Sequence, residues 1–259
     1  MIGQEKLIKQ LNNFTYNSIP RTLLFVGAFG CGKHTLVDML STNFNVGIKN
    51  ISNKLSYEKI IEFSLDPTPY IYLVDKELNP IEQNSLLKFI EEPPETARII
   101  ILAENENSLL ETIKGRCQKF VFEKYSKEEL SQFSNDENIL NYFETPGEIL
   151  SISQNCDWVF QLCDTIMTKI AYANIPNILT IPNKFDFGKE EEKFNVLVFM
   201  KLLMKKCLEY VESNKTNKYC ETYLTISDYF NKMKLPQVDK KKLFELCLLE
   251  IKQKLRNDN

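Results

Sequence analysis

The sequence predicts an α/β layer, a five-stranded parallel sheet with helices on both faces, followed by an all-helical part. Apolar runs that do not alternate with polar residues occur up to about Phe122, which is typical of strands buried on both faces. Helical patterns separate these runs, as the crossovers of a parallel sheet require. From Asp157 onward the strand patterns fade and a helical spacing of apolar residues replaces them.

Five runs are expected to form the strands, in chain order "TLLFVG", "VGIKNIS", "PYIYLVD", "RIIILAE" and "KFVFE". The helix that follows the third run is delimited at both ends. Asn79 can act as its N-cap, Pro80 suits the first helical position, and Glu82 stands three residues after the cap. Pro93 and Pro94 end the pattern, so the sequence predicts a helix that begins at Pro80 and stops before them.

Changes in composition along the chain predict three parts, at residues 1–123, 124–155 and 156–259. The second part is short, polar and helical in pattern, and Pro146-Gly147 punctuates it. In the third part the segment 193–212 is apolar almost all round, which predicts a helix at the centre of a bundle or at a subunit interface.

The overall composition excludes several classes of protein. A net charge of −3 argues against an isolated, strongly basic nucleic-acid binder. The 7 cysteines are scattered without a C-x-x-C pair, which favours reduced thiols over disulfides or a zinc site. The start of the chain has no signal-peptide pattern, and no apolar run approaches the roughly 20 residues of a membrane span. We expect a soluble cytoplasmic protein that contains no zinc and contacts no membrane.

A glycine-rich loop lies between the first expected strand and the next helix. In "VGAFGCGKHT" the glycines allow the backbone to wrap around phosphates and to point amides at them from a helix N-terminus. The residues expected to bind a nucleotide are Gly27, Gly30, Cys31, Gly32, Lys33, His34 and Thr35.

Binding and hydrolysis are separate expectations for this loop. A hydroxyl after the lysine normally holds the magnesium ion, but this chain has its single histidine, His34, at that position. Thr35 follows on a different side of the helix. An imidazole suits softer metals than magnesium, so we interpret His34 as a replacement and expect no metal ligand in the loop.

The end of the third expected strand supplies the next candidate, Asp75, which either anchors magnesium through water or caps the strand end. A nucleotide hydrolase with such a phosphate-binding loop usually has a glutamate directly after this aspartate, to orient the attacking water. Lys76 stands there instead, and Glu77 is displaced by one position.

The segment 82–122 identifies a family. It resembles the stretch of AAA+ clamp-loader subunits in which Q-N-x-L-L-K-x-x-E-E-P-P leads to a strand and then to T-I-x-S-R-C-Q. The opening "IGQEKLIKQL" and the run "TPGEIL" also resemble this family's start and its lid. The matching residues are Gln83, Asn84, Leu86, Leu87, Lys88, Glu91, Glu92, Pro93, Pro94, Thr112, Ile113, Arg116, Cys117 and Gln118.

The resemblance implies names and partners for the three parts: an AAA+ RecA-like phosphate-loop domain, a short helical lid and a helical collar for oligomerisation. Subunits of this family form a five-membered ring that uses ATP to open a sliding clamp and place it on primer-template DNA. The implied partners are therefore the other subunits of a hetero-pentameric ring, the clamp and, through the assembled complex, DNA. The arginine of the S-R-C motif reaches into a neighbour's ATP site, and here it would be Arg116, preceded by Gly115 instead of serine.

Three departures from the family pattern weaken the expected ATPase activity: His34, Lys76 and Glu148, which stands near the place of a lid arginine that senses the γ-phosphate. Asp75 can also align with a later aspartate of the pattern. A degenerate phosphate loop beside an intact arginine motif resembles the delta-prime subunit, the stator of the bacterial loader. ATP would then be held weakly or structurally, without firm magnesium and with little or no hydrolysis by this chain. Two alternatives remain open: an ATP-hydrolysing motor subunit, and a helicase loader or small-molecule kinase.

Overall fold

A computed structural model describes residues 3–153, 156–187, 193–214, 217–235 and 238–256. The chain divides into two compact units, and one of the three points of division falls within the helix Pro146–Ser153. The first unit contains Met1–Gln132 and Thr145–Gly147, and the second contains Phe133–Glu144 and Glu148–Asn259. The three expected parts with boundaries at 123 and 155 stay a prediction, and the second boundary lies outside the described residues.

The first unit contains the expected five-stranded parallel sheet, in the order β2-β3-β4-β1-β5. Its strands are β1 (Thr22–Val26), β2 (Gly47–Asn50), β3 (Tyr70–Val74), β4 (Ala97–Ala103) and β5 (Gln118–Val121). Each strand lies within one of the five runs predicted from the sequence or begins one residue before it. β4 lies between β1 and β3, with Thr22 opposite Ile99 and Tyr72 opposite the same residue on the other side. The carboxyl ends of β1, β3 and β4 therefore meet at one edge of the sheet.

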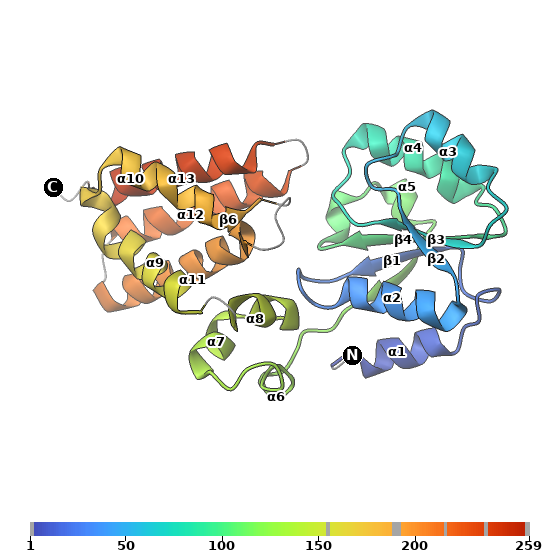
Figure 1. The fold of residues 1–259 in the computed structure, drawn as a ribbon, viewed down its shortest axis with the longest axis horizontal. Helices are drawn as coiled ribbons and strands as arrows, with labels where there is room; N and C mark the ends of the chain where they lie inside the picture. The colour runs from blue at the N-terminus through green and yellow to red at the C-terminus, as the bar shows by residue number, and fades with distance from the viewer. Residues whose placement is uncertain (1–2, 154–155, 188–192, 215–216, 236–237, 257–259) are drawn as a thin grey trace. The chain divides into compact units, whose positions relative to one another are not determined.

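Helices cover both faces of this sheet, as Figure 1 shows. One face packs against α3 (Tyr57–Ser64), α4 (Pro80–Glu91) and α5 (Glu111–Lys114), and the other against α1 (Glu5–Asn12) and α2 (Lys33–Phe44). Each face of the sheet has its own apolar core. The central strand β1 contributes to both, because Leu24 packs in the core with α4, and its neighbours Leu23 and Phe25 pack in the core with α2. The first unit is therefore the five-stranded parallel sheet with helices on both faces that the sequence predicted.

Helix α4 confirms the sequence expectation in detail. The Asn79 side chain accepts a hydrogen bond from the Glu82 N–H, and the Glu82 carboxylate accepts one from the Asn79 N–H, which completes a capping box. Pro80 occupies the first turn, and the helix ends at Glu91, before the proline pair.

The second unit is helical, as expected, with one small exception. Its long helices are α9 (Cys156–Lys169), α11 (Val196–Asn214), α12 (Asn217–Lys234) and α13 (Lys240–Arg256). Its shorter ones are α7 (Glu137–Tyr142), most of α8 (Pro146–Ser153), η2 (Ile170–Tyr172), α10 (Ile175–Thr180) and η3 (Ile181–Lys184), whereas α6 (Lys127–Leu130) lies in the first unit. The apolar helix α11 packs against both α9 and α12, as a central helix should.

The exception is a short parallel pair, β6 (Phe185–Asp186) with β7 (Phe194–Asn195). Phe185 and Phe194 both pack against Trp158, so burial of aromatic rings accompanies this pairing. A two-residue run is too short to give an alternating pattern, which is why the sequence did not predict it. None of the described helices combines the length and apolarity that crossing a bilayer requires.

Candidate functional site

The glycine-rich loop connects β1 to α2 in the first unit. Gly30 and Gly32 have φ angles of 76° and 96°, a left-handed conformation that side chains rarely adopt. Gly32 is also the N-cap of α2, and no side chain caps this helix end. The uncapped first turn carries the partial positive charge of the helix dipole, which makes it a suitable binding place for an anion.

The ammonium group of Lys33 lies inside the loop. Its Nζ donates hydrogen bonds to the carbonyl oxygens of Gly27 (2.6 Å) and Ala28 (2.9 Å), and only 9% of the residue is exposed. In this arrangement the loop carbonyls occupy the donors that a phosphate would use, so phosphate binding requires Lys33 to exchange these partners.

Close packing beneath the loop explains Gly27 and Cys31. A Cβ atom at Gly27 would lie 2.7 Å from both the Cys31 sulfur and the Phe122 Cβ, which is too close for any side chain. Burial raises the pKa of the Cys31 thiol, despite the neighbouring charge of Lys33. The Cys31 side chain therefore contributes packing, and this residue can face a ligand only through its backbone.

Three groups that are distant in sequence hold consecutive carbonyls of the loop. The Thr145 hydroxyl donates to the Phe29 oxygen (2.9 Å), the Gly147 N–H to the Gly30 oxygen (2.9 Å), and the Tyr125 hydroxyl to the Cys31 oxygen (2.8 Å). These contacts were missed from the sequence, where "TPGEIL" was noted for its family resemblance and for the break at Pro146-Gly147.

Gly147 has a steric reason to be glycine. A Cβ on this residue would lie 2.6 Å from the Gly30 Cα, so the backbone at Gly147 approaches the loop more closely than any other residue type permits.

His34 and Asp75 are brought into direct contact. The His34 Nε2 lies 3.3 Å from the Asp75 Oδ2, although the two residues are 41 positions apart. The Asn50 amide donates to the same carboxylate oxygen (2.8 Å), and the Ser52 hydroxyl donates to the other one (2.6 Å). Both Asp75 oxygens are thus engaged by protein groups. Asn50 and Ser52 were missed from the sequence, although Asn50 ends β2 and Ser52 follows it, at the edge of the sheet where Asp75 follows β3.

The hydrogen bond with His34, supported by those from Ser52 and Asn50, lowers the pKa of Asp75 even though partial burial opposes this shift. Asp75 therefore bears a negative charge at neutral pH.

This arrangement does not suit magnesium. An imidazole stands where the hydroxyl ligand is needed, it contacts the carboxylate directly, and magnesium demands oxygen ligands in near-octahedral geometry. Thr35, the next residue, is exposed on α2. Across the residues that the structure describes, no three histidine, cysteine or acidic side chains gather as a metal site.

The Lys76 side chain forms an ion pair that has a structural role. Its Nζ lies 2.9 Å from the Glu82 carboxylate, the same group that caps α4. Lys76 occupies the position where a water-orienting glutamate would be expected. It is instead a cation that stabilises the start of α4.

Arg116 follows α5 and lies at the surface of the first unit. Its Nη2 is 2.9 Å from the Glu91 carboxylate and its Nη1 donates to the Thr112 oxygen (3.0 Å), while 42% of the side chain stays exposed. Glu91 belongs to the same family motif as Arg116. The Gly115 backbone is helical, and a Cβ there would have an ordinary contact of 3.4 Å, so the serine of the family pattern would fit.

Gln83 supports the segment that leads to Arg116. Its buried amide donates to the carbonyls of Leu78 (2.9 Å) and Ser108 (3.0 Å), and its oxygen accepts from the Leu110 N–H (2.8 Å). The side chain therefore ties α4 to the start of α5, and this is a physical reason for glutamine at this motif position.

Glu148 takes part in a different structure, the core of the second unit. Its carboxylate is only 3% exposed and lies 2.5 Å from the Lys201 ammonium of α11. The residue therefore pairs with a cation of its own unit, and an acidic side chain cannot supply the positive charge that a phosphate sensor provides.

Comparisons with known proteins indicate the relationships of this chain. Residues 48–126 match the family described as "DNA polymerase III, delta subunit". The DNA polymerase III subunit gamma of Buchnera aphidicola subsp. Schizaphis graminum is 25% identical over 170 residues, which are 51% of this chain and 47% of that protein. The chain thus spans about half the length of this curated relative. These sequence similarities support a relationship with clamp-loader-type DNA polymerase III subunits.

Among solved structures, a DNA polymerase III gamma subunit-related protein from Thermotoga maritima aligns with a TM-score of 0.50 and 13% identity, covering 98% of this chain and 100% of that one. At this identity the likeness concerns the fold alone.

Proposed function

We propose that this chain is a delta-prime-like stator subunit of a DNA polymerase clamp loader, which completes the ATP site of a neighbouring subunit with Arg116. One combination of observations carries the proposal. The arginine motif has Arg116 on the surface, while beside the chain's own loop His34 and Asp75 contact each other where a magnesium ion would be needed.

The role of Arg116 follows from its chemistry. A guanidinium stabilises the negative charge that develops on a transferred phosphoryl group, and it keeps its own positive charge at every physiological pH. The Glu91 contact is a half-exposed ion pair, which contributes little energy and can be exchanged for a phosphate at low cost. Glu91 would hold the arginine ready until the neighbour's ATP arrives.

The loop of this chain would hold ATP weakly or structurally, with little or no hydrolysis. The uncapped α2 terminus would receive the phosphates, and Lys33 would turn from the Gly27 and Ala28 carbonyls to meet them. Asp75 would keep its contacts with His34 and Ser52. No step of the proposal depends on magnesium in this loop.

The proposed partners are the other subunits of a hetero-pentameric ring, the sliding clamp and, through the complex, primer-template DNA. The similarity to DNA polymerase III subunits supports them. The net charge of −3 agrees with DNA contact that is shared among subunits rather than made by this chain alone. The proposed location is the cytoplasm.

The test is to assemble the loader from this chain and its partner subunits with Arg116→Ala and to measure ATP hydrolysis and clamp loading. A matched control is Arg21→Ala, because Arg21 is also half exposed in the first unit and also lies near a glutamate, Glu95. We expect a loss of about 1000-fold in the turnover of one neighbouring site for Arg116→Ala and no change for the control.

Sedimentation of both assemblies separates this effect from a failure to assemble. If complete rings that contain Arg116→Ala keep the normal ATPase and clamp-loading rates, the proposal is wrong.

A second candidate, an ATP-hydrolysing motor subunit, is favoured by one observation: the loop keeps the backbone form and the lysine of a phosphate-binding loop. Nucleotide titrations with and without magnesium distinguish the two. The stator predicts absent or magnesium-independent binding, whereas magnesium-dependent turnover that Lys33→Ala abolishes would establish the motor. A helicase loader or small-molecule kinase has weaker support, because it does not account for the motif from Gln83 to Arg116.

A further inference from the structure

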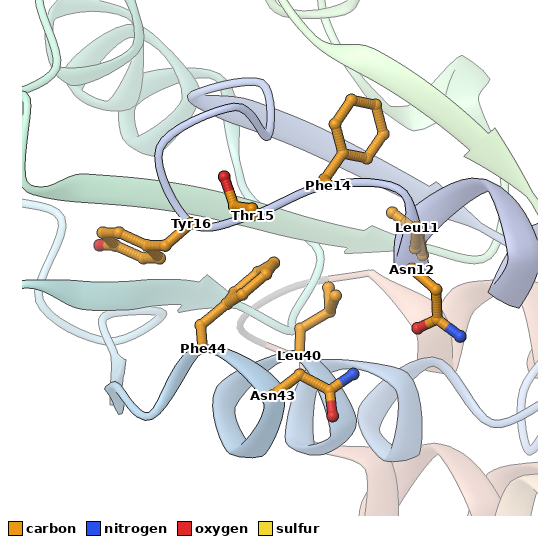
Figure 2. Close-up of a pocket in the computed structure, with 8 residues that line it drawn as sticks. All are labelled: Leu11, Asn12, Phe14, Thr15, Tyr16, Leu40, Asn43 and Phe44. Atoms are coloured by element: carbon orange, nitrogen blue, oxygen red, sulfur yellow. The ribbon is translucent and has the colours of Figure 1, made fainter.

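A pocket lies in the first unit, away from the glycine-rich loop. It has a volume of about 460 Å³ and opens between the end of α1, the connection to β1 and the last turns of α2 (Figure 2). The residues that line it are Leu11, Asn12, Phe14, Thr15, Tyr16, Leu40, Asn43 and Phe44. Sites for small molecules commonly have volumes of a few hundred Å³, so this pocket can hold one aromatic ring system.

The pocket is separate from the proposed nucleotide site. Lys33 begins α2, whereas Asn43 and Phe44 end it. At 1.5 Å of rise per residue these ends lie about 15 Å apart, farther than the phosphates of one nucleotide extend. A ligand in the pocket would therefore not share contacts with the glycine-rich loop.

Aromatic rings form the pocket walls, and one of them is held firmly. Tyr16 and Phe44 meet edge to face, with ring centroids 5.7 Å apart. The Tyr16 hydroxyl donates to the Thr96 carbonyl (2.5 Å), and the guanidinium of Arg98 stacks 4.5 Å from the Tyr16 ring centroid. Because these contacts hold Tyr16 in place before a ligand arrives, binding costs little ordering of this wall.

The pocket also offers unused polar groups. Within the described residues, the side-chain amides of Asn12 and Asn43 have no hydrogen-bond partner, and both line the opening. Each amide supplies two donors and one acceptor. No side chain that lines the pocket is charged, so nothing there would balance the charge of a phosphate or an acid.

We propose that this pocket binds a neutral, planar heteroaromatic ring with donors and acceptors on its edge, which is the chemistry of a nucleobase. The ring lies against Tyr16 and Phe44, and the amides of Asn12 and Asn43 bond to its edge. This inference does not depend on the proposed clamp-loader function.

The experiment uses the full chain and saturation-transfer NMR with adenosine, guanosine, cytidine and thymidine, and with a short single-stranded oligonucleotide. Saturation transfer to a free nucleoside that exceeds transfer to the oligonucleotide identifies a nucleoside as the source of the ring. The reverse identifies a nucleic acid.

Two variants locate the binding. Asn43→Trp should fill the pocket and abolish saturation transfer. The double variant of Asn12→Ala with Asn43→Ala should weaken binding about tenfold, by removing two hydrogen bonds. The matched control is the double variant of Asn53→Ala with Asn84→Ala, which changes two exposed amides of the same unit elsewhere and should bind normally.

Circular dichroism checks that each variant is folded. The proposal is overturned if no nucleoside or oligonucleotide gives saturation transfer, or if binding survives in the folded double pocket variant. It is also overturned if benzene binds as tightly as the nucleosides, because the amides would then contribute nothing.

Discussion

Gln83→Leu should loosen the segment that carries Arg116 without disturbing the second unit. Leucine has nearly the same size and keeps the apolar contacts of a side chain that is 4% exposed. It cannot replace the three hydrogen bonds that Gln83 makes with Leu78, Ser108 and Leu110.

The expected magnitude follows from these contacts. At about 1 kcal/mol for each lost hydrogen bond, the substitution should destabilise the segment by about 3 kcal/mol. Because every 1.4 kcal/mol corresponds to about a tenfold change in an equilibrium constant, the local opening constant should rise by about 100-fold. The loss falls on the segment between Ser108 and Arg116, which Gln83 holds at the Ser108 carbonyl and at the Leu110 N–H.

Hydrogen exchange by mass spectrometry measures this effect directly. Peptides that cover residues 105–117 should exchange faster in Gln83→Leu, and the Leu110 amide should lose most of its protection. The fluorescence of Trp158, which lies in α9, reports the unfolding of the second unit. The urea midpoint of that unfolding should stay unchanged. Asn84→Ala, a change in the adjacent exposed amide of α4, serves as the control and should alter nothing. Unchanged exchange at Leu110 in a folded Gln83→Leu protein would refute the role assigned to Gln83.

Further predictions concern the helix cap, the buried ion pair and the carboxylate beside His34. Asn79→Ala removes the N-cap of α4 and should cost about 1 kcal/mol, measured by exchange of the first-turn amides. Lys201→Met removes the ammonium group that pairs with the buried Glu148 carboxylate and should destabilise the second unit by about 3 kcal/mol, measured by urea unfolding followed through the single tryptophan; an unchanged midpoint would contradict the pairing. Because the hydrogen bond from His34 lowers the pKa of Asp75, its stabilising contribution is complete above the ordinary aspartate pKa and is lost as the pH falls through the lowered value. His34→Ala should therefore move the titration of Asp75, followed by NMR of its carboxyl carbon, to higher pH; an unmoved titration would exclude the contact.

Much of the fold was predictable because its signals are local. The capping box of α4 involves residues only three positions apart, and a short apolar run predicted each strand of the sheet. The glycine-rich loop was equally visible, because its positive φ angles demand glycine at Gly30 and Gly32. The short β6–β7 pair was not predictable, since its aromatic residues are buried by packing that no short run encodes.

The candidate site likewise has features that were predictable from the sequence and features that were not. The residue types at His34, Asp75 and Arg116 were singled out from the chain, together with the expectation that magnesium would not be held firmly. Most of the groups that they contact were not predicted, because these groups lie in distant segments of the chain. Glu148 was considered beside the phosphates, but its carboxylate is paired 53 positions away with Lys201 in the second unit.

The sequence by itself determined the order of strands and helices along the chain, the glycine-rich turn after the first strand and the chain position of the arginine motif, since these depend on neighbouring residues. Only the tertiary structure decided that His34 contacts Asp75, because this requires β3 and β1 to flank β4 in one parallel register. It likewise decided that Gln83 anchors the segment before Arg116 across 27 positions. Such contacts depend on the packing of several segments that are distant in the sequence, and no local pattern in the chain encodes that packing.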